Sequence, residues 1–389
     1  MQRAYDVIVV GARCAGASTA MLLARAGLDV LLVDRVRLPR EIPQGHFIHR
    51  HGPQRLADWS LLEPMLATGC PPSTSITTDF GDFALSGKGL VVDGVPVGLG
   101  PRRAALDRVL AEAAVDAGAE LRDGFAVRDL VYEGDRVAGV RGEPGGTERG
   151  RFIVGADGKT SSVAKWVGAE SYEGVPTLSC WYFSYWSGVH GEGLELYVRE
   201  RRAIFAFPTN DELFAIFVAW PISELDTVRA DPELRLRDAI DGVPEFAERV
   251  RRGRREERIY GAARLPNFLR KPYGPGWGLV GDAGCHKDPF LALGVCDAFR
   301  DAELLSAALA DALSGERSEA EALAAFERRR NEATMADYRE NLVQARLEPP
   351  PPDVLALRAE LRGDQEATNR FYLAREGRSH RPESSPASE

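Results

Sequence analysis

The sequence predicts a mixed α/β (α+β) fold with a Rossmann-like lobe, an interleaved antiparallel sheet and C-terminal helices. Three observations support this fold class. An apolar strand, a glycine-containing turn, a helix and a second apolar strand fill the first 34 residues. Aromatic segments with the two-residue alternation of strands lie between residues 178 and 220. Helical patterning then dominates from residue 318 to residue 374.

Length and composition limit the function classes. A chain of 389 residues predicts two or three domains, or one large interleaved body. The net charge of −9 argues against nucleic acid or an anionic membrane as the main partner. The five scattered cysteines fit no zinc-site spacing and indicate reduced thiols. Since no apolar run reaches 18 residues and no signal peptide is evident, we expect a cytoplasmic protein without a membrane span.

The N-terminal βαβ unit carries the first chemical signal. A near-continuous β-branched run at 5–10 is typical of a strand buried on both faces, and it leads into a turn that begins at Gly11. Gly11 permits the tight turn, while Gly16 lets the following helix pack closely on the strand. The free N–H groups at the helix start suit a pyrophosphate. Asp34 ends the second strand, 23 residues after Gly11, where it can accept hydrogen bonds from an adenosine ribose. We therefore predict a dinucleotide site.

Two residues of this turn, Arg13 and Cys14, carry reactive or charged side chains. Arg13 replaces the middle glycine of G-x-G-x-x-G, so its side chain must point away from the phosphates or contact them. Cys14 stands at the helix start, where the dipole can lower a thiol pKa, although small-residue packing beside the cofactor is the favoured interpretation. The candidate cofactor residues of this unit are Gly11, Ala12, Arg13, Cys14, Ala15, Gly16, Asp34 and Arg35.

Three later motifs specify the dinucleotide. They are an R-x-x-L-D pattern that begins at Arg103, a strand that runs into Asp157-Gly158, and a buried strand with Asp282 at its end. The last strand leads through a Pro289 loop to a helix at Gly294. Together with the first turn, they resemble the p-hydroxybenzoate hydroxylase-like FAD superfamily. This superfamily comprises class A flavin monooxygenases, geranylgeranyl-reductase-like enzymes and flavin-dependent halogenases. The matching segments run from residue 7 to about residue 305.

The resemblance implies a role for each motif. Gly11, Ala15 and Gly16 would cradle the FAD pyrophosphate, and Asp34 would hold the ribose. The remaining assignments place Arg103 at the phosphate–ribityl region, Asp157 and Gly158 at the cleft and the nicotinamide route, Asp282 at a ribityl or phosphate oxygen, and the Gly294 and Val295 N–H groups at the O2 side of the isoalloxazine.

The chain departs from the family pattern beside the flavin ring. The G-x-G before the last helix keeps only Gly294, because Ala292 replaces the first glycine. Cys296 stands where an asparagine is common, and Cys285 occupies a histidine position, with His286 next to it. These changes affect the expected chemistry more than the expected FAD binding.

The substrate lobe is predicted from alternation. In the segment CWYFSYW, alternation places Trp181, Phe183 and Tyr185 on one face and Tyr182, Ser184 and Trp186 on the other, and either face can line a pocket. We predict an FAD-binding domain at 1–74, 98–175 and 265–345 and a substrate sheet at 75–97 and 176–264. A C-terminal helix at 346–376 is expected to pack on the FAD lobe, with a disordered tail at 377–389.

Histidines supply the candidate catalytic groups. Three of the six fall between 46 and 51, without a carboxylate or cysteine at ligand spacing, so a flavin or substrate loop is favoured over a metal site or a plain surface loop. From this loop we select His49, and from the Pro289 loop His286, because imidazole transfers protons near neutral pH. The alternative for His286 is a backbone hydrogen bond that only sets the loop.

The resemblance implies an enzyme with FAD and a transient NAD(P)H reductant. The favoured reaction is a monooxygenation with O2, through a C4a-hydroperoxyflavin, of a small apolar or aromatic substrate. The alternative is a reductase or dehydrogenase that acts by hydride transfer at N5. A halogenase is disfavoured, since the W-x-W-x-I-P segment is absent and no lysine is expected between flavin and substrate. A non-catalytic flavoprotein is the remaining possibility.

Overall fold

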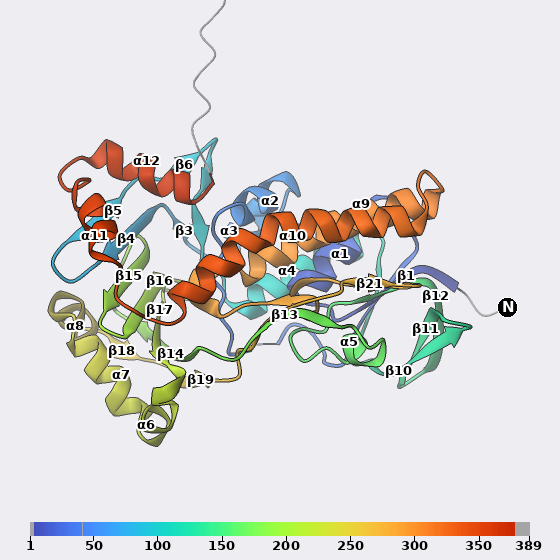
Figure 1. The fold of residues 1–389 in the computed structure, drawn as a ribbon, viewed down its shortest axis with the longest axis horizontal. Coiled ribbons are helices and arrows are strands. Elements are labelled where there is room, and N and C mark those ends of the chain that lie inside the picture. Colours follow the sequence, from blue (N-terminus) through green and yellow to red (C-terminus); the bar gives the residue numbers. More distant parts are fainter. Residues whose placement is uncertain (1–3, 41, 378–389) are drawn as a thin grey trace, which may run out of the picture.

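The computed structural model describes residues 4–40 and 42–377. Figure 1 shows an elongated molecule with a nucleotide-binding type of lobe around β1 and α1 at one end. A second lobe, with β14 to β17 and the helices α6 to α8, forms the other end. The long helix α10 (Glu319–Gln344) runs along the molecule toward the second lobe. This arrangement confirms the predicted α/β fold class.

The first lobe is built on a mixed sheet. Its strand order is β10-β11-β12-β1-β2-β9, and β1 lies between two parallel neighbours, β2 and β12. β22 extends the parallel part next to β12 and pairs with β21. The strands are β1 (Ala4–Val10), β2 (Val30–Asp34), β9 (Glu120–Asp123), β10 (Ala126–Glu133), β11 (Arg136–Glu143), β12 (Gly146–Gly155), β21 (Tyr273–Gly274) and β22 (Trp277–Leu279).

Helices cover this sheet and form the main core. α1 contacts both α4 and α9, and α9 contacts α10. Their buried faces share one apolar cluster with β1 and β2, which explains the Ala- and Leu-rich sequences of these helices. The helices of this layer are α1 (Cys14–Arg25), α4 (Arg103–Asp116) and α9 (Gly294–Ser314).

The second lobe is built on an antiparallel aromatic sheet. The strand order is β18-β14-β17-β16-β15-β4-β5, with β19 also paired to β14 and β4 parallel to β15. The strands are β4 (Ser75–Asp79), β5 (Ala84–Gly87), β14 (Ser179–Ser187), β15 (Gly193–Arg199), β16 (Arg202–Pro208), β17 (Phe214–Pro221), β18 (Arg254–Arg255) and β19 (Tyr260–Ala262).

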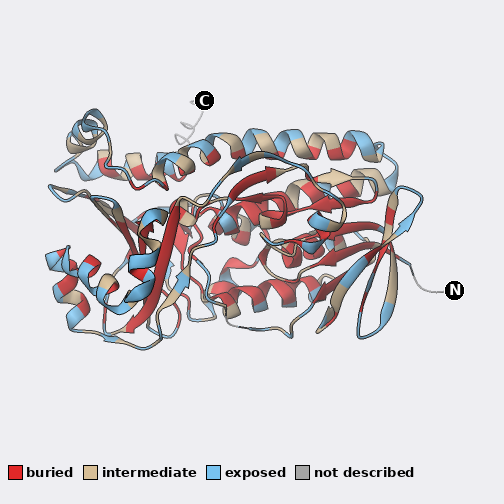
Figure 2. Ribbon diagram, turned by 60° about the horizontal axis from the view of Figure 1, so that its bottom comes forward, coloured by how far each residue is buried: buried red, intermediate tan, exposed pale blue. Residues whose placement is uncertain are grey.

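The two faces of β14 have different neighbours. Tyr182 and Trp186 pack in a cluster with α6 (Leu225–Ala230), α7 (Pro232–Asp241) and α8 (Pro244–Arg251). Trp181, Phe183 and Tyr185 instead join a cluster with Phe47 and Phe290, which belong to the histidine loop and the Pro289 loop. The strands of this sheet are mostly buried (Figure 2). The face of Trp181 is therefore the one that looks toward the expected cofactor.

The remaining elements are short. They are α2 (Gly52–Asp58), α3 (Leu62–Leu66), α5 (Ser162–Trp166), β3 (Pro72–Ser73), β6 (Val91–Val92), β7 (Val95–Pro96), β8 (Gly98–Leu99), β13 (Ser171–Val175), β20 (Asn267–Arg270), β23 (Cys285–His286), and the 3-10 turns η1 (Ile222–Glu224), η2 (Gly281–Ala283) and η3 (Pro289–Leu291).

The C-terminal region differs from the predicted single helix at 346–376. It forms two helices, α11 (Pro352–Ala359) and α12 (Gln365–Arg375), because Gly363 has a φ of +83° and Asp364 caps α12 by accepting from the Ala367 N–H. α12 packs on β5 of the aromatic sheet, and its last residue, Arg375, also pairs with Glu340 of α10. The predicted tail at 377–389 lies, from residue 378 on, outside the described residues. No helix within 4–40 and 42–377 is long and apolar enough to span a membrane.

Candidate cofactor and substrate site

The turn between β1 and α1 is shaped by close backbone approach. Gly11 has a φ of +105°, and a Cβ on it would lie 2.5 Å from the Ala156 carbonyl oxygen. A Cβ on Gly16 would lie 1.7 Å from the Gly11 carbonyl oxygen. No side chain caps the start of α1. The two glycines therefore let the turn pack closely on the chain after β12 and on the start of α1, and the uncapped N–H groups of α1 suit a pyrophosphate.

Asp34 fixes this turn from the second strand. Its buried carboxylate accepts hydrogen bonds from the Ala12 N–H and the Val36 N–H, both at 2.9 Å. Each carboxylate oxygen retains a further acceptor site, so ribose hydroxyl groups can still donate to it. Arg35, which follows directly, is exposed.

Arg103 is a buried cation beside the β1–α1 turn, where it contacts the Cys14 Sγ at 3.3 Å. It is 7% exposed and donates to the Gln44 side chain at 2.7 Å and to Asp107 at 3.1 Å. Its Nε is buried without a hydrogen-bond partner within the described residues. A buried N–H without an acceptor is costly, so this atom fits a cofactor that supplies one.

The side chains of Arg13 and Cys14 both face Asp107. The Arg13 Nε lies 3.9 Å from the Asp107 carboxylate, so this side chain turns toward α4. Burial is the main cause that raises the pKa of Cys14 to about 12. The thiol is therefore protonated at neutral pH, as expected for a small packing residue.

The other two motif aspartates differ in their environment. Asp157 caps α5, where it accepts from the Ser162 N–H at 2.6 Å, and Gly158 follows with a φ of +79°. Asp282 was expected at the end of a buried strand, but β22 ends at Leu279 and Asp282 lies in η2, partly exposed. No described residue forms a hydrogen bond with the Asp282 carboxylate, although its charge acts on Arg103. It is thus available to a ligand in the cleft.

The turn before α9 is held tightly from two sides. Asp288 accepts from the Ser179 hydroxyl at 2.5 Å and from the Phe290 N–H at 3.1 Å. Burial raises the pKa of Asp288 to about 6. The Asn341 side chain of α10 donates to the Asp288 carbonyl and accepts from the Leu291 N–H. This frame keeps the turn in place although nothing of α9 itself caps it.

The start of α9 is open. Ala292 has a φ of +50°, a left-handed conformation that is strained for a residue with a side chain. α9 begins at Gly294 with no side-chain cap. Gly294 is exposed, a Cβ on it would meet nothing within 4 Å, and Val295 is buried. The start of α9 thus has no side-chain cap and an exposed first residue, and its positive helix end suits an anionic ring edge.

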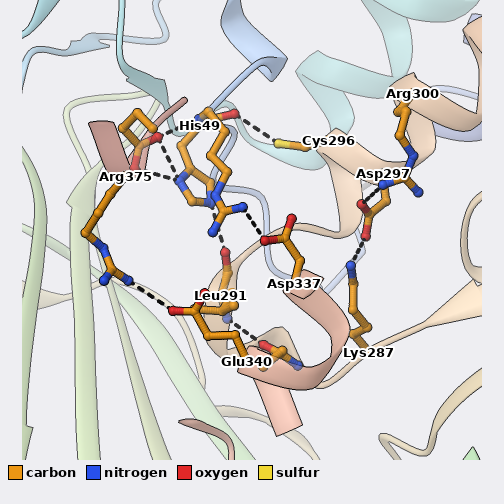
Figure 3. Close-up of polar contacts among 12 residues, drawn as sticks. His49, Lys287, Leu291, Cys296, Asp297, Arg300, Asp337, Glu340 and Arg375 are labelled. Atoms are coloured by element: carbon orange, nitrogen blue, oxygen red, sulfur yellow. Dashed lines mark hydrogen bonds and ion pairs between the residues drawn. The ribbon is translucent and has the colours of Figure 1, made fainter. Parts of the chain in front are cut away.

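His49 lies next to this turn, and both of its ring nitrogens are engaged. Nδ1 is 3.0 Å from a carboxylate oxygen of Glu376, and Nε2 is 2.8 Å from the Leu291 carbonyl oxygen (Figure 3). Glu376 follows α12 and is 327 positions away in the chain, so no local pattern could have indicated it. Its contribution was missed by the sequence analysis.

The other histidines have structural neighbours of different kinds. The Nδ1 of His286 faces the Pro266 carbonyl oxygen, and the ring stacks on Phe268 with centroids 5.7 Å apart. This is the loop-setting contact that the sequence analysis left open. His46 is buried with its Nε2 2.9 Å from the Tyr185 hydroxyl, and burial lowers its pKa to about 3. Within the described ranges, no group of His, Cys, Asp and Glu is arranged to hold a metal ion.

A buried charge cluster supports α9 from behind. Lys287 and Arg300 both pair with Asp297 at 2.6 Å, and Arg300 also pairs with Asp301 at 2.7 Å (Figure 3). Asp301 in turn accepts from the Gly281 N–H at 3.2 Å. Since two cations face two carboxylates, the cluster is balanced, and it ties η2 to α9. No sequence motif had pointed to it.

An apolar cavity adjoins the turn before α9. It has a volume of about 130 Å³ and lies between β4, β15 and β16, the turn at Leu291 and Ala292, and the region of α10 to α12. Apart from His49, its charged lining residues are four arginines and two glutamates, with no lysine. These are Arg199, Arg202, Arg358, Arg375, Glu348 and Glu376.

The turn, the ribose-side carboxylate, the partnerless Arg103 Nε and the open start of α9 together define a dinucleotide-binding flavoprotein of the Rossmann type. Residues 4–339 match the model of the family described as FAD binding domain. The chain therefore belongs to this family, and it is an FAD-dependent oxidoreductase. The resemblance expected from the motifs is confirmed.

Sequence relatives include archaeal enzymes named for lipid reduction. The digeranylgeranylglycerophospholipid reductase of Methanocella arvoryzae is 26% identical over 348 residues, which cover 86% of this chain and 84% of that protein. The enzyme of the same name from Methanosarcina acetivorans is 27% identical over 361 residues, which cover 88% and 84%.

Solved structures of the same fold have other reactions in their names. The myxobacterial chondrochloren halogenase CndH has a TM-score of 0.80 at 22% identity, covering 97% of this chain and 91% of its own. The probable FAD-dependent monooxygenase PqsL of Pseudomonas aeruginosa has a TM-score of 0.77 at 21% identity, covering 88% and 96%. At these identities the likeness shows the fold.

Proposed function

We propose that this protein is an NAD(P)H-dependent monooxygenase that hydroxylates an apolar or aromatic substrate with O2. The observation that carries the proposal is the apolar cavity, which reaches Leu291 and Ala292, directly before the open start of α9. When bound, FAD carries electrons from NAD(P)H to oxygen and activates that oxygen toward the substrate. The expected cytoplasmic location and the absence of nucleic-acid and membrane partners stay predictions.

The residues of the nucleotide end would bind and orient FAD. The β1–α1 turn would receive the pyrophosphate, and Asp34 the ribose hydroxyl groups. Arg103 would direct its partnerless Nε to an oxygen of the phosphate or ribityl chain, with Asp282 close by to accept from a hydroxyl. We expect non-covalent binding, because burial keeps the nearby Cys285 and Cys296 protonated, with pKa values raised to about 12 and about 11.

The cavity walls would exclude water from the reacting end. Phe205 and Phe290 line it near the turn, and their rings contact each other edge to face with centroids 5.3 Å apart. A dry cavity favours oxygen transfer to the substrate over loss of peroxide to water. The reaction needs no nucleophile from the protein, which agrees with a lining that offers none at this end.

The far end of the cavity indicates an acidic group on the substrate. Arg202 and Arg358 line the cavity, and neither has a carboxylate partner within the described residues. Burial and the neighbouring Arg375 lower the pKa of Arg358, as expected for a cation without a counter-charge. Along β16, Arg202 is five residues from Phe207, which packs on Phe47 of the histidine loop, so Arg202 lies about 17 Å along the strand from that contact.

A reductase that transfers hydride to a substrate double bond is the second candidate. It is favoured by the names of the archaeal relatives, which are digeranylgeranylglycerophospholipid reductases at 26% and 27% identity. The elongated apolar cavity suits an isoprenoid chain as well as an aromatic ring. The halogenase alternative is weaker, because no lysine lines the cavity.

The experiment uses the FAD-loaded protein, NADH or NADPH, and ¹⁸O₂, with a panel of apolar and aromatic carboxylic acids as probes. Gain of one ¹⁸O atom by a probe, with matching NAD(P)H consumption, supports monooxygenation. In a parallel anaerobic arm, digeranylgeranylglycerophospholipid is the probe, and gain of two hydrogens per double bond supports the reductase. A yellow protein that oxidises no NAD(P)H with any probe would reject both reactions.

A further inference from the structure

We propose that Glu376, which follows the last described helix, is a positioning residue of the flavin site. It acts through His49, whose other ring nitrogen holds the turn that leads into α9. This inference rests on the proposed placement of the flavin ring at the start of α9. It assigns a role in the redox centre to a residue of the C-terminal region, which none of the sequence motifs reaches.

The carboxylate of Glu376 is buried and charged. It is 6% exposed, lies 3.0 Å and 3.2 Å from the Nδ1 of His49, and accepts from the Arg50 N–H at 2.6 Å. Burial by itself raises the pKa of Glu376, but the contacts with His49 and Arg50 outweigh it and lower the pKa below its usual value. A fixed negative charge therefore sits behind the imidazole ring.

The opposite side of the imidazole faces a second acceptor. The Nε2 of His49 is 2.8 Å from the Leu291 carbonyl oxygen. A neutral imidazole has one N–H and one lone pair, so it can donate to only one of two acceptors, whereas the charged ring donates to both. Glu376 supplies the negative charge that balances a ring with both N–H groups. The pair thereby secures the hydrogen bond to Leu291.

The hydrogen bond to Leu291 holds the chain segment that leads into α9. Leu291 is followed by Ala292 in its strained left-handed conformation and then by the start of α9 at Gly294. The main chain of His49 contacts the same helix, since its carbonyl oxygen accepts from the Cys296 Sγ at 3.1 Å (Figure 3). His49 thus holds the turn with its side chain and the first turn of α9 with its backbone.

Neighbouring ion pairs fix the other residues around this contact. Arg50 pairs with Asp337 at 2.7 Å, and Arg375 pairs with Glu340 at 3.4 Å, both on α10 (Figure 3). These pairs hold the loop and α12 against α10 without contact to Leu291. Glu376 and His49 therefore form the link through which the C-terminal region acts on the turn.

The test compares Glu376→Gln with the parent in the FAD-loaded protein. The glutamine removes the charge that balances His49, so the Leu291 turn is released and the α9 N–H groups align less well with the reduced, anionic ring. Loss of the negative charge alone would favour the anionic flavin, but this charge lies behind His49 whereas the α9 N–H groups adjoin the expected ring position, so we expect the midpoint potential of the bound flavin to become more negative. Reduced FAD should lose about fivefold more affinity than oxidised FAD, a factor typical of one helix-end interaction.

Two further variants make the result specific. Glu366→Gln changes the same type of residue within α12, the helix that Glu376 follows, but its ion pair with Arg370 is exposed, so the potential should not change. His49→Gln should shift the potential in the same direction as Glu376→Gln, and the double variant should show no additional shift, because both act on one contact. If a variant binds FAD too weakly for a potential measurement, flavin absorbance spectra and FAD dissociation constants are compared instead. The comparison covers the parent, the two single variants and the double variant.

An unchanged potential in Glu376→Gln would overturn the inference, and so would shifts that add up in the double variant. Neither result would affect the proposed reaction, which is judged by the products of the parent protein. Conversely, failure of the parent to transfer oxygen or hydrogen to any probe would reject the proposed function while the potentials of the variants remained informative.

Discussion

The two ends of the cofactor cleft are built in different ways. At the pyrophosphate end, Gly11, Gly16 and Asp34 are near neighbours in the chain, and the shape comes from backbone contact with Ala156 and from the Ala12 N–H. At the flavin end, the turn before α9 is held by side chains from the histidine loop, from α10 and from the residue after α12. One end is fixed by the backbone and the other by side-chain bridges.

This difference separates two properties of the site. A backbone-shaped turn leaves little room for substitution, so binding of the cofactor should depend on a few positions with large effects. A turn held by side-chain bridges can be altered in small steps, because each bridge contributes about 1 kcal/mol or a few times that. We therefore expect affinity to be set at the pyrophosphate end and redox behaviour at the flavin end.

The largest effect is expected from Gly16→Ala. Its Cβ would lie 1.7 Å from the Gly11 carbonyl oxygen, and backbone atoms on both sides cannot yield. We expect loss of FAD binding and a destabilisation of at least about 3 kcal/mol, measured by denaturant unfolding and flavin content. Gly174→Ala is the matched control, since its Cβ would meet nothing within 4 Å. A Gly16→Ala protein that retained FAD would show that the turn is not backbone-limited.

Asp34→Ala should weaken FAD binding by about 1–3 kcal/mol. The variant removes the buried acceptor of the Ala12 and Val36 N–H groups as well as the expected ribose contact. The measurement is the FAD dissociation constant by fluorescence quenching after removal of the flavin. Glu376→Gln, at the other end, should change this constant for oxidised FAD much less, and equal losses in the two variants would contradict the proposed division.

Asp288→Asn tests how much stability the protein loses by burying the ionised Asp288 carboxylate, which holds the turn before α9. Burial raises the pKa of Asp288 from 3.8 to about 6 in the folded protein. The folded state therefore binds this proton more tightly than the unfolded state, and the favourable contribution is lost as the pH rises from about 4 to 6. The asparagine buries no charge, keeps one oxygen for the Phe290 N–H and can donate its amide N–H to the Ser179 hydroxyl, so this variant should be more stable than the parent at pH 7 by about 1–3 kcal/mol.

The check is the free energy of unfolding of both proteins between pH 4 and pH 7. The advantage of Asp288→Asn should shrink as the pH falls toward 4. An advantage of constant size over this range would mean that Asp288 does not titrate there.

The smallest effect is expected at the arginine end of the cavity. Arg202→Gln and Arg358→Gln should each reduce the preference for dodecanoate over dodecanol by about fivefold, since the lost pairs are partly solvated. Calorimetric titration of the FAD-loaded protein measures this preference. Arg329→Gln on the exposed side of α10 is the control. If both cavity variants kept the parent's preference, the acidic group would bind elsewhere or be absent from the substrate.

The sequence predicted what depends on local pattern. The βαβ turn, the strand at 152–155 and the helix from Gly294 are visible because glycine spacing and apolar runs reflect backbone geometry directly. Asp282 was misplaced because β22 ends at Leu279, three residues before it. The face of β14 could not be chosen, since both faces carry aromatic side chains and only the position of Phe290 and the helices α7 and α8 distinguishes them.

What the sequence could not indicate depends on residues that meet only after folding. His49 was selected as a candidate, but its partner Glu376 lies 327 positions away, and neither residue stands in a motif with the other. The same holds for Asn341, which bridges Asp288 and Leu291 from α10. The C-terminal break at Gly363 had a local cause, whereas the packing of α12 on β5 did not.

The position of α11 and α12 has a consequence for how such enzymes diversify. These helices supply one wall of the cavity and join the remainder of the chain through the proline-rich segment at 348–352. Exchange of residues within 352–375 can therefore change which compounds are admitted while the dinucleotide turn keeps its sequence. Glu376 limits this freedom, because the same segment also ends at the residue that reaches His49. We therefore expect a substitution of Glu376 to change both the substrate range and the flavin potential, whereas substitutions within 352–375 should change the substrate range alone.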